Sequence, residues 1–143
     1  MKILWILMVF SFAGCMDYQL LGVNNGRLKD CPKYPNCVNS QAEQSDDTHY
    51  IKPISFNGDK TDAVEKMKRT ILSFERTEIL QSDSVYIHAT FTSKFFRFVD
   101  DVEFYADDQA KAFHVRSASR LGMGDHGVNR ERIESVRKAF EKQ

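Results

Sequence analysis

The chain has 143 residues, of which 42% are hydrophobic and 28% are charged, a composition that is ordinary for a globular domain. Basic and acidic side chains number 20 each, so the formal net charge at pH 7 is zero with neutral histidines. This balance argues against a protein that binds nucleic acid through its overall charge. We therefore expect no nucleic-acid partner.

The first fourteen residues have the features of a signal peptide. Lys2 supplies a positive start, and an apolar run of eleven residues follows it at positions 3–13. A membrane-spanning helix needs roughly 20 apolar residues, so this run is too short to remain as an anchor. Removing the segment leaves 129 residues with 19 basic and 20 acidic side chains, because Lys2 is its only charged residue.

Two small residues, Ala13 and Gly14, stand directly before Cys15, as in signals whose cysteine thiol receives a lipid. We expect a lipoprotein held on a membrane through Cys15, with residues 15–27 as a tether. An aspartate directly after the cysteine would oppose sorting to the outer membrane, but this position holds Met16. We therefore expect attachment to the outer membrane, with the domain facing the periplasm of the cell envelope. An ordinary secretory signal beside an incidental cysteine is the alternative.

The two remaining cysteines, Cys31 and Cys37, form an even pair in an oxidising compartment. Prolines at positions 32 and 35 bend the segment between them. A disulfide is expected. Free thiols remain an alternative, as does a zinc half-site, although the nearest histidine is His49.

One helix pattern precedes the strand patterns of the domain at residues 28–143. Asp59 or Thr61 serves as its N-cap, and the helix is expected to end near Glu78. The apolar residues at helical spacing are Val64, Met67, Ile71 and Phe74.

Three strands are expected next. Apolar and polar residues alternate from Ser84 onward, which predicts a half-buried strand. Residues 97–105 and 111–117 then form a hairpin that turns at Asp107 and Asp108. If these two aspartates are the whole loop, Val102 lies opposite Phe113. One face of the hairpin then holds Val102, Phe104, Phe113 and Val115, and the other holds Asp101, Glu103, His114 and Arg116.

A last helix is expected from about Asn129, with Ile133, Val136 and Phe140 on one face. The helices are too few to alternate with the strands. The pattern therefore predicts an α+β fold in which an antiparallel β-sheet has one helix before it and a C-terminal helix packed on one face.

Four arginines surround the connection between the last strand and the last helix: Arg116, Arg120, Arg130 and Arg132. Cations are unfavourable at a helix N-terminus, so negative charge is expected beside them. Internal ion pairs with Asp100, Asp101 or Asp125 are one explanation. A bound anionic ligand at the helix start is the other. Asp100 points to the core side in the expected register, so we predict its pairing with Arg120 or Arg130.

Catalytic patterns are weaker. Ser117 and Ser119 lie near His114 and His126 in the sequence, but no nucleophile motif surrounds either serine. His88 and His114 share a polar sheet face with acidic residues, an arrangement that usually holds no metal. We expect no catalytic residue, no metal and no cofactor.

Three segments together resemble one family, the domain of unknown function DUF1499. They are LKDCPKYPNCVNS at residues 28–40, FVDDVE at residues 98–103 and RSASRLGMGDHGVNR at residues 116–130. The resemblance extends from about residue 28 to the C-terminus, and it implies a membrane-targeted N-terminus in many members. Lys33 and Tyr34 stand where a serine commonly precedes the second proline, and His126 stands where an apolar residue is common, which argues against His126 as a general base. The resemblance implies no activity, ligand or catalytic residue.

Two functions follow as expectations. The first is a non-enzymatic cell-envelope module that binds a small anionic or amphiphilic ligand, or a partner, through the arginine-rich loop. The second is a periplasmic hydrolase that uses Ser117 or Ser119 with a histidine.

Overall fold

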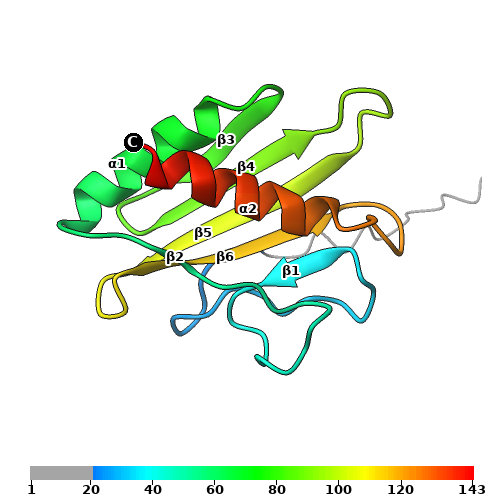
Figure 1. Cartoon of the computed structure of the whole chain (residues 1–143), viewed down its shortest axis with the longest axis horizontal. Coiled ribbons are helices and arrows are strands. Elements are labelled where there is room, and N and C mark those ends of the chain that lie inside the picture. Colours follow the sequence, from blue (N-terminus) through cyan, green and yellow to red (C-terminus); the bar gives the residue numbers. More distant parts are fainter. Residues whose placement is uncertain (1–20) are drawn as a thin grey trace, which may run out of the picture.

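The structure is a computed structural model that describes residues 21–143. The expected signal peptide, the lipidation site Cys15 and the first part of the expected tether lie outside these residues. In Figure 1 the described chain forms one sheet whose front face carries both helices. The predicted α+β class is confirmed, with one helix before the main strands and a C-terminal helix on the sheet.

Six strands form an antiparallel sheet, and hairpins connect its consecutive long strands. Its order is β1-β6-β5-β4-β3, and β2 also pairs with β6. The strands are β1 (Cys37–Asn39), β2 (Ile54–Ser55), β3 (Thr77–Ser82), β4 (Tyr86–Thr92), β5 (Val99–Asp107) and β6 (Ala112–Ser119). The sequence pattern predicted the three longest strands and missed β1, β2 and β3.

Helix α1 (Lys60–Leu72) begins as predicted but ends earlier than the sequence indicated. Asp59 is its N-cap, and the Asp59 carboxylate accepts from the backbone N–H of Thr61 at 2.6 Å. The expected end near Glu78 is wrong, because Arg76 adopts a left-handed backbone (φ 58°) and β3 starts one residue later. Phe74 fits the helical stripe but packs from the loop against Phe91, with ring centroids 5.9 Å apart.

The β5–β6 hairpin has a longer loop than the two aspartates alone would make. Asp107 and Ala112 are its last paired residues, so four residues close the turn. Val102 therefore lies opposite Ser117, and the predicted pairing of Val102 with Phe113 is wrong. The register differs by four positions, an even number, so the expected division between an apolar face and a polar face is confirmed.

The core lies between the apolar sheet face and the two helices. Helix α2 (Val128–Glu141) runs across this face and buries Ile133, Val136 and Phe140, as its spacing predicted. The fully buried apolar sheet residues of this core include Ile54, Ile87, Ala89, Val102, Phe104, Phe113 and Val115. The other sheet face carries no helix and is the polar face.

Cys31 and Cys37 form a disulfide, as the sequence predicted, with Cα atoms 5.7 Å apart. The bond closes the loop that leads into β1. No helix among residues 21–143 is both long enough and apolar enough to cross a bilayer.

Candidate functional site

The helix-covered face of the sheet contains a buried polar network around Arg132, which lies in the first turns of α2. The Arg132 guanidinium forms an ion pair with the Asp100 carboxylate of β5. It also donates to Ser117 Oγ at 3.1 Å and to Asn129 Oδ1 at 2.7 Å. Asp100 is 5% exposed, and a carboxylate so buried is stable as an ion only beside a cation. This pair therefore joins the last helix to the sheet.

Arg120 and Arg130, the partners expected for Asp100, bind elsewhere, so that predicted pairing is wrong. Arg120 lies on the polar face and donates to both Asp101 carboxylate oxygens at 2.8 Å. Arg130 donates to backbone carbonyl oxygens of the loop that precedes β2. Those carbonyls belong to Asp47, Thr48 and Tyr50, at 3.2, 3.1 and 2.7 Å. Asp100 points to the opposite sheet face from Arg120, which explains why Arg132 from the helix is its partner.

Asn129 and Asp125 organise the loop before α2. The Asn129 side chain is fully buried, and its amide donates to the Asn36 carbonyl at 3.0 Å and to Asp125 Oδ2 at 2.7 Å. Asp125 was expected to pair with an arginine, but instead it accepts from the backbone N–H groups of Gly127 and Asn129 at 2.9 Å. Burial raises the pKa of Asp125, yet these hydrogen bonds outweigh it and the net pKa lies below the ordinary value. Gly127 is the N-cap residue of α2, and Asp125, two residues before it, satisfies backbone N–H groups at the helix start.

The two serines of the hydrolase hypothesis have no imidazole partner in the described chain. Ser117 Oγ donates to Asn129 Oδ1 at 2.5 Å, and Ser119 Oγ accepts from the same side chain at 3.0 Å. His126 is exposed on the loop before α2. A serine nucleophile needs a base within hydrogen-bond reach, and neither Ser117 nor Ser119 meets that condition.

A serine and a histidine that the sequence did not connect do meet on the polar face. Ser40 Oγ lies 3.3 Å from His114 Nδ1, and His114 Nε2 lies 3.7 Å from Asp107 Oδ2. The Ser40 residue is 7% exposed, and its oxygen already accepts the Val115 backbone N–H at 2.8 Å. Two hollows on the described surface are lined by other residues. The contact therefore fastens the segment after β1 to β6.

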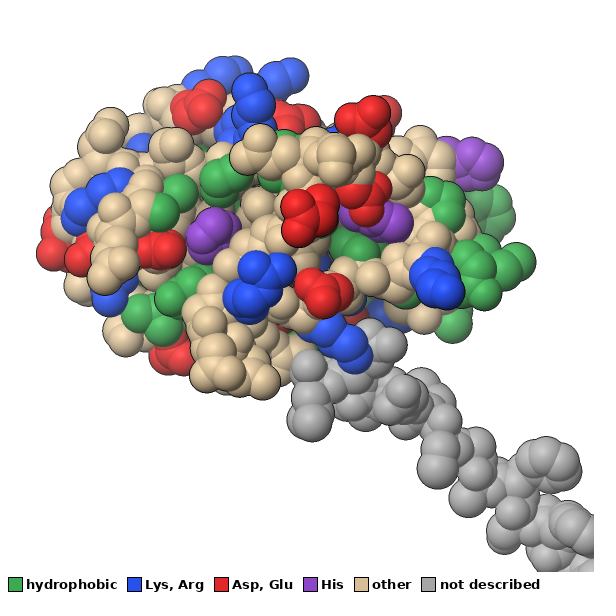
Figure 2. Space-filling view, turned by 90° about the horizontal axis from the view of Figure 1, so that it is seen from below, with side chains coloured by type: hydrophobic (Ala, Val, Ile, Leu, Met, Phe, Trp, Pro, Cys, Tyr) green, Lys and Arg blue, Asp and Glu red, His purple; other side chains and the backbone are tan. Residues whose placement is uncertain are grey.

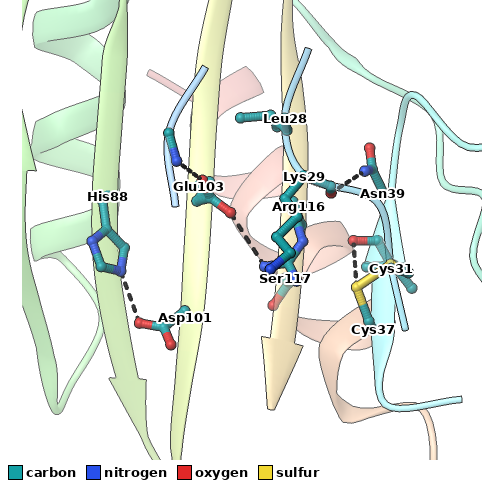
Figure 3. A network of polar contacts seen from close by, with 12 residues as sticks. Leu28, Lys29, Cys31, Cys37, Asn39, His88, Asp101, Glu103, Arg116 and Ser117 are labelled. Carbon is teal, nitrogen blue, oxygen red and sulfur yellow. Dashed lines mark hydrogen bonds and ion pairs between the residues drawn. A yellow bond between two sulfur atoms is a disulfide. The ribbon is translucent and has the colours of Figure 1, made fainter. Parts of the chain in front are cut away.

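The polar face also holds a buried ion pair, which Figure 3 shows from close by. Arg116 on β6 donates to Glu103 on β5 at 3.2 Å, and Glu103 also accepts from the Tyr86 hydroxyl at 2.8 Å and the Gly22 backbone N–H at 2.9 Å. Burial and the neighbouring Glu103 raise the pKa of Tyr86 well above its ordinary value. Residues 21–27 of the expected tether are thus fastened to the sheet at Gly22.

Asp101 connects His88 and Arg120 on the same face. Its carboxylate accepts from His88 Nε2 and from Arg120, each at 2.8 Å. Burial opposes ionisation, but the hydrogen bonds from His88 and Arg120 lower the pKa of Asp101 to about 2. Residues 21–143 contain no cluster of three or more histidine, cysteine or acidic side chains that could hold a metal ion.

At one end of the sheet, large apolar side chains are exposed on the described surface. They come from the β4–β5 loop and the β6–α2 loop, which are neighbours because the Arg120 N–H donates to the Val99 carbonyl at 3.2 Å. We call this group the apical patch. Its members, with their exposed fractions, are Phe95 (82%), Phe96 (78%), Leu121 (72%), Met123 (67%) and Phe98 (53%). Figure 2 shows hydrophobic side chains gathered at this right-hand end.

Sequence reasoning missed the apical patch, although residues 94–98 read KFFRF. A connection between strands is usually built from glycine, proline and small polar residues, so three phenylalanines there are a signal. The rings of Phe96 and Phe98 stack on each other with centroids 5.6 Å apart, and both remain exposed.

The fold and these sites define the class of protein: a small α+β domain with two helices on one face of an antiparallel sheet, a disulfide before its edge strand and two buried arginine–carboxylate pairs. The chain belongs to the family described as protein of unknown function (DUF1499), whose family model matches residues 27–140. The match includes the disulfide, the Arg132 network and the apical patch. No curated protein and no solved structure matches the chain.

Proposed function

We propose that the protein is a cell-envelope lipoprotein, anchored through lipid on Cys15, whose domain is a non-enzymatic module that binds an amphiphile through the apical patch. One observation carries this proposal. The serines and arginines considered for catalysis or anion binding have partners inside the domain, whereas five large apolar side chains are exposed together at one end. An exposed apolar cluster of this kind marks a surface for binding.

The same observation favours an amphiphile over a small anion. Three of the four arginines expected to hold an anion pair with carboxylates, and Arg130 donates to three backbone carbonyls. The first N–H groups at the start of α2 are occupied by Asp125. An anion would have to displace these contacts, whereas an apolar chain would cover surface that is exposed to water.

Two features of the sequence support the envelope location. The signal ends in small residues directly before Cys15, and the disulfide between Cys31 and Cys37 suits an oxidising compartment such as the periplasm. The residue after the lipidated cysteine is Met16, which favours the outer membrane.

Native mass spectrometry of the full chain, purified from bacterial membranes, tests the proposal. Wild type should carry lipid mass on Cys15 and a co-purifying amphiphile. Phe95→Ser combined with Phe96→Ser should keep the lipid mass and lose the amphiphile, while Leu80→Ser, which removes a half-exposed apolar side chain from β3, should keep both. An unmodified Cys15 would contradict the anchor, and an amphiphile retained by the Phe95/Phe96 variant would contradict the binding surface.

A further inference from the structure

We propose that the apical patch docks onto the surface of an anionic lipid bilayer and holds the domain in one orientation there; this inference rests on the proposed anchoring through Cys15. The patch lies on two loops at the end of the sheet rather than on a flat face. Phenylalanine, leucine and methionine on protruding loops can enter the boundary between headgroups and acyl chains without disturbing the strands behind them.

The charges beside the patch suit an anionic surface. Residues 92–99 contain Lys94 and Arg97 and no acidic residue, and both basic side chains are exposed. Lys94 Nζ lies 5.6 Å from the centroid of the Phe95 ring. The acidic residues that follow, Asp100 and Asp101, are already paired with arginines. Basic side chains interspersed among aromatic rings allow the rings to insert while the cations stay at the level of the phosphate groups.

The length of the tether places the bilayer within reach. Gly22 is fixed to Glu103, which lies four residues along β5 from Val99 and therefore about 13 Å from the patch end of the sheet. Six residues lie between Cys15 and Gly22, and this segment of seven Cα–Cα steps spans at most about 25 Å. A lipid on Cys15 can therefore lie in the same bilayer that the patch touches.

Charge also argues against a second copy of this chain as the occupant. A two-fold contact through the patch would bring Lys94 and Arg97 of one copy close to the same residues of the other. Like charges brought together in an interface that excludes water oppose association. The anionic bilayer is the occupant that satisfies both the rings and the cations.

Tryptophan depth measurements on the lipidated mature protein test the inference. The sequence has one tryptophan, Trp5, in the expected signal peptide that the mature protein lacks, so any introduced tryptophan is unique. Phe96→Trp reports on the patch. Gln109→Trp is the matched control, because it lies in the exposed β5–β6 loop at the other end of β5, roughly 27 Å away. The vesicles contain brominated acyl chains and either phosphatidylcholine alone or phosphatidylcholine with phosphatidylglycerol.

We expect vesicles with phosphatidylglycerol to quench the fluorescence of the Phe96→Trp variant and to leave that of the Gln109→Trp variant unquenched. Lys94→Gln with Arg97→Gln should lower the docking equilibrium constant about thirtyfold on anionic vesicles. Lys138→Gln with Lys142→Gln, at the far end of α2, should leave it unchanged.

Three results would overturn the docking inference: both reporters unquenched in protein that floats with the vesicles, equal quenching of both, or a blue shift of the Phe96→Trp emission that depends on protein concentration without vesicles. The last result would assign the patch to a second copy. Protein that fails to float at all would instead overturn the proposed anchor, so the two failures are distinguishable.

Discussion

Arg132 of α2 and Asp100 of β5 form an ion pair beneath the helix, with side chains only 11% and 8% exposed. The Arg132 guanidinium also lies 5.3 Å from the centroid of the Phe91 ring. The pair therefore fixes the start of the C-terminal helix on the sheet and brings the β6–α2 loop beside the β4–β5 loop. The position of the apical patch depends on this contact.

Asp100→Asn should destabilise the domain by about 3–5 kcal/mol, because it leaves the buried Arg132 charge without its carboxylate. Urea unfolding followed by circular dichroism measures the change. Glu65→Gln breaks an exposed pair with Lys68 on α1 and should cost less than about 1 kcal/mol. Equal losses in the free energy of unfolding would contradict a larger contribution from the buried pair.

Asn129→Leu should also destabilise the domain, by about 2–4 kcal/mol, since Asn36, Ser117 and Asp125 lose a buried partner. Asn57→Leu changes an exposed asparagine and serves as the control. The same unfolding measurement applies. A loss below about 0.5 kcal/mol for Asn129→Leu would mean that the network rearranges without it.

Reduction of the Cys31–Cys37 disulfide should lower the free energy of unfolding by about 2–3 kcal/mol, because the short closed loop restricts the unfolded chain. Unfolding curves with and without reductant give the value, and the paired Cys31→Ser and Cys37→Ser variant should match the reduced protein. Two thiols that react with a labelling reagent in unreduced, folded protein would contradict the bond.

The pKa of Asp101, about 2 in the folded protein, predicts an acid-dependent contribution to stability. The folded pKa is below the unfolded value, so the contribution is fully present above about pH 4 and is lost as the pH falls towards 2. Partial exposure limits it to roughly 1–2 kcal/mol. Wild type should be more stable than Asp101→Asn at pH 6, and the difference should disappear near pH 2. A difference that stays constant with pH would contradict the assignment.

Sequence periodicity predicted the parts of the fold that repeat over several turns or several strand residues. The buried stripes of both helices and the two faces of the β5–β6 hairpin follow from spacing alone. Strands β1 and β2 contain only three and two residues, too few for a pattern. The edge strand β3 reads TEILQS, in which Leu80 is exposed and no clean alternation exists.

The partners of the arginines could not be predicted in the same way. The sequence correctly placed Asp100 on the core side, where a carboxylate needs a buried cation. Which arginine supplies the cation depends on where α2 crosses the sheet, and that could not be read from the sequence. Asp125 carries the same charge as Asp100 but accepts backbone N–H groups at the start of α2 instead, because only three residues separate it from Asn129. The KFFRF segment of the apical patch can be read from the sequence. That residues 121–123 lie beside it follows only from the fold.

Hydrogen–deuterium exchange of the lipidated full chain tests most directly the claim that an anchored domain presents its apical patch to the membrane. Exchange in vesicles that contain phosphatidylglycerol is compared with exchange in vesicles of phosphatidylcholine alone. We predict slower exchange in the anionic vesicles for peptides that contain residues 94–98 and 121–123, with no change for the loop at residues 108–111 at the other end of the sheet. Unchanged exchange in the patch peptides, together with full recovery of the protein in the vesicles, would contradict the claim.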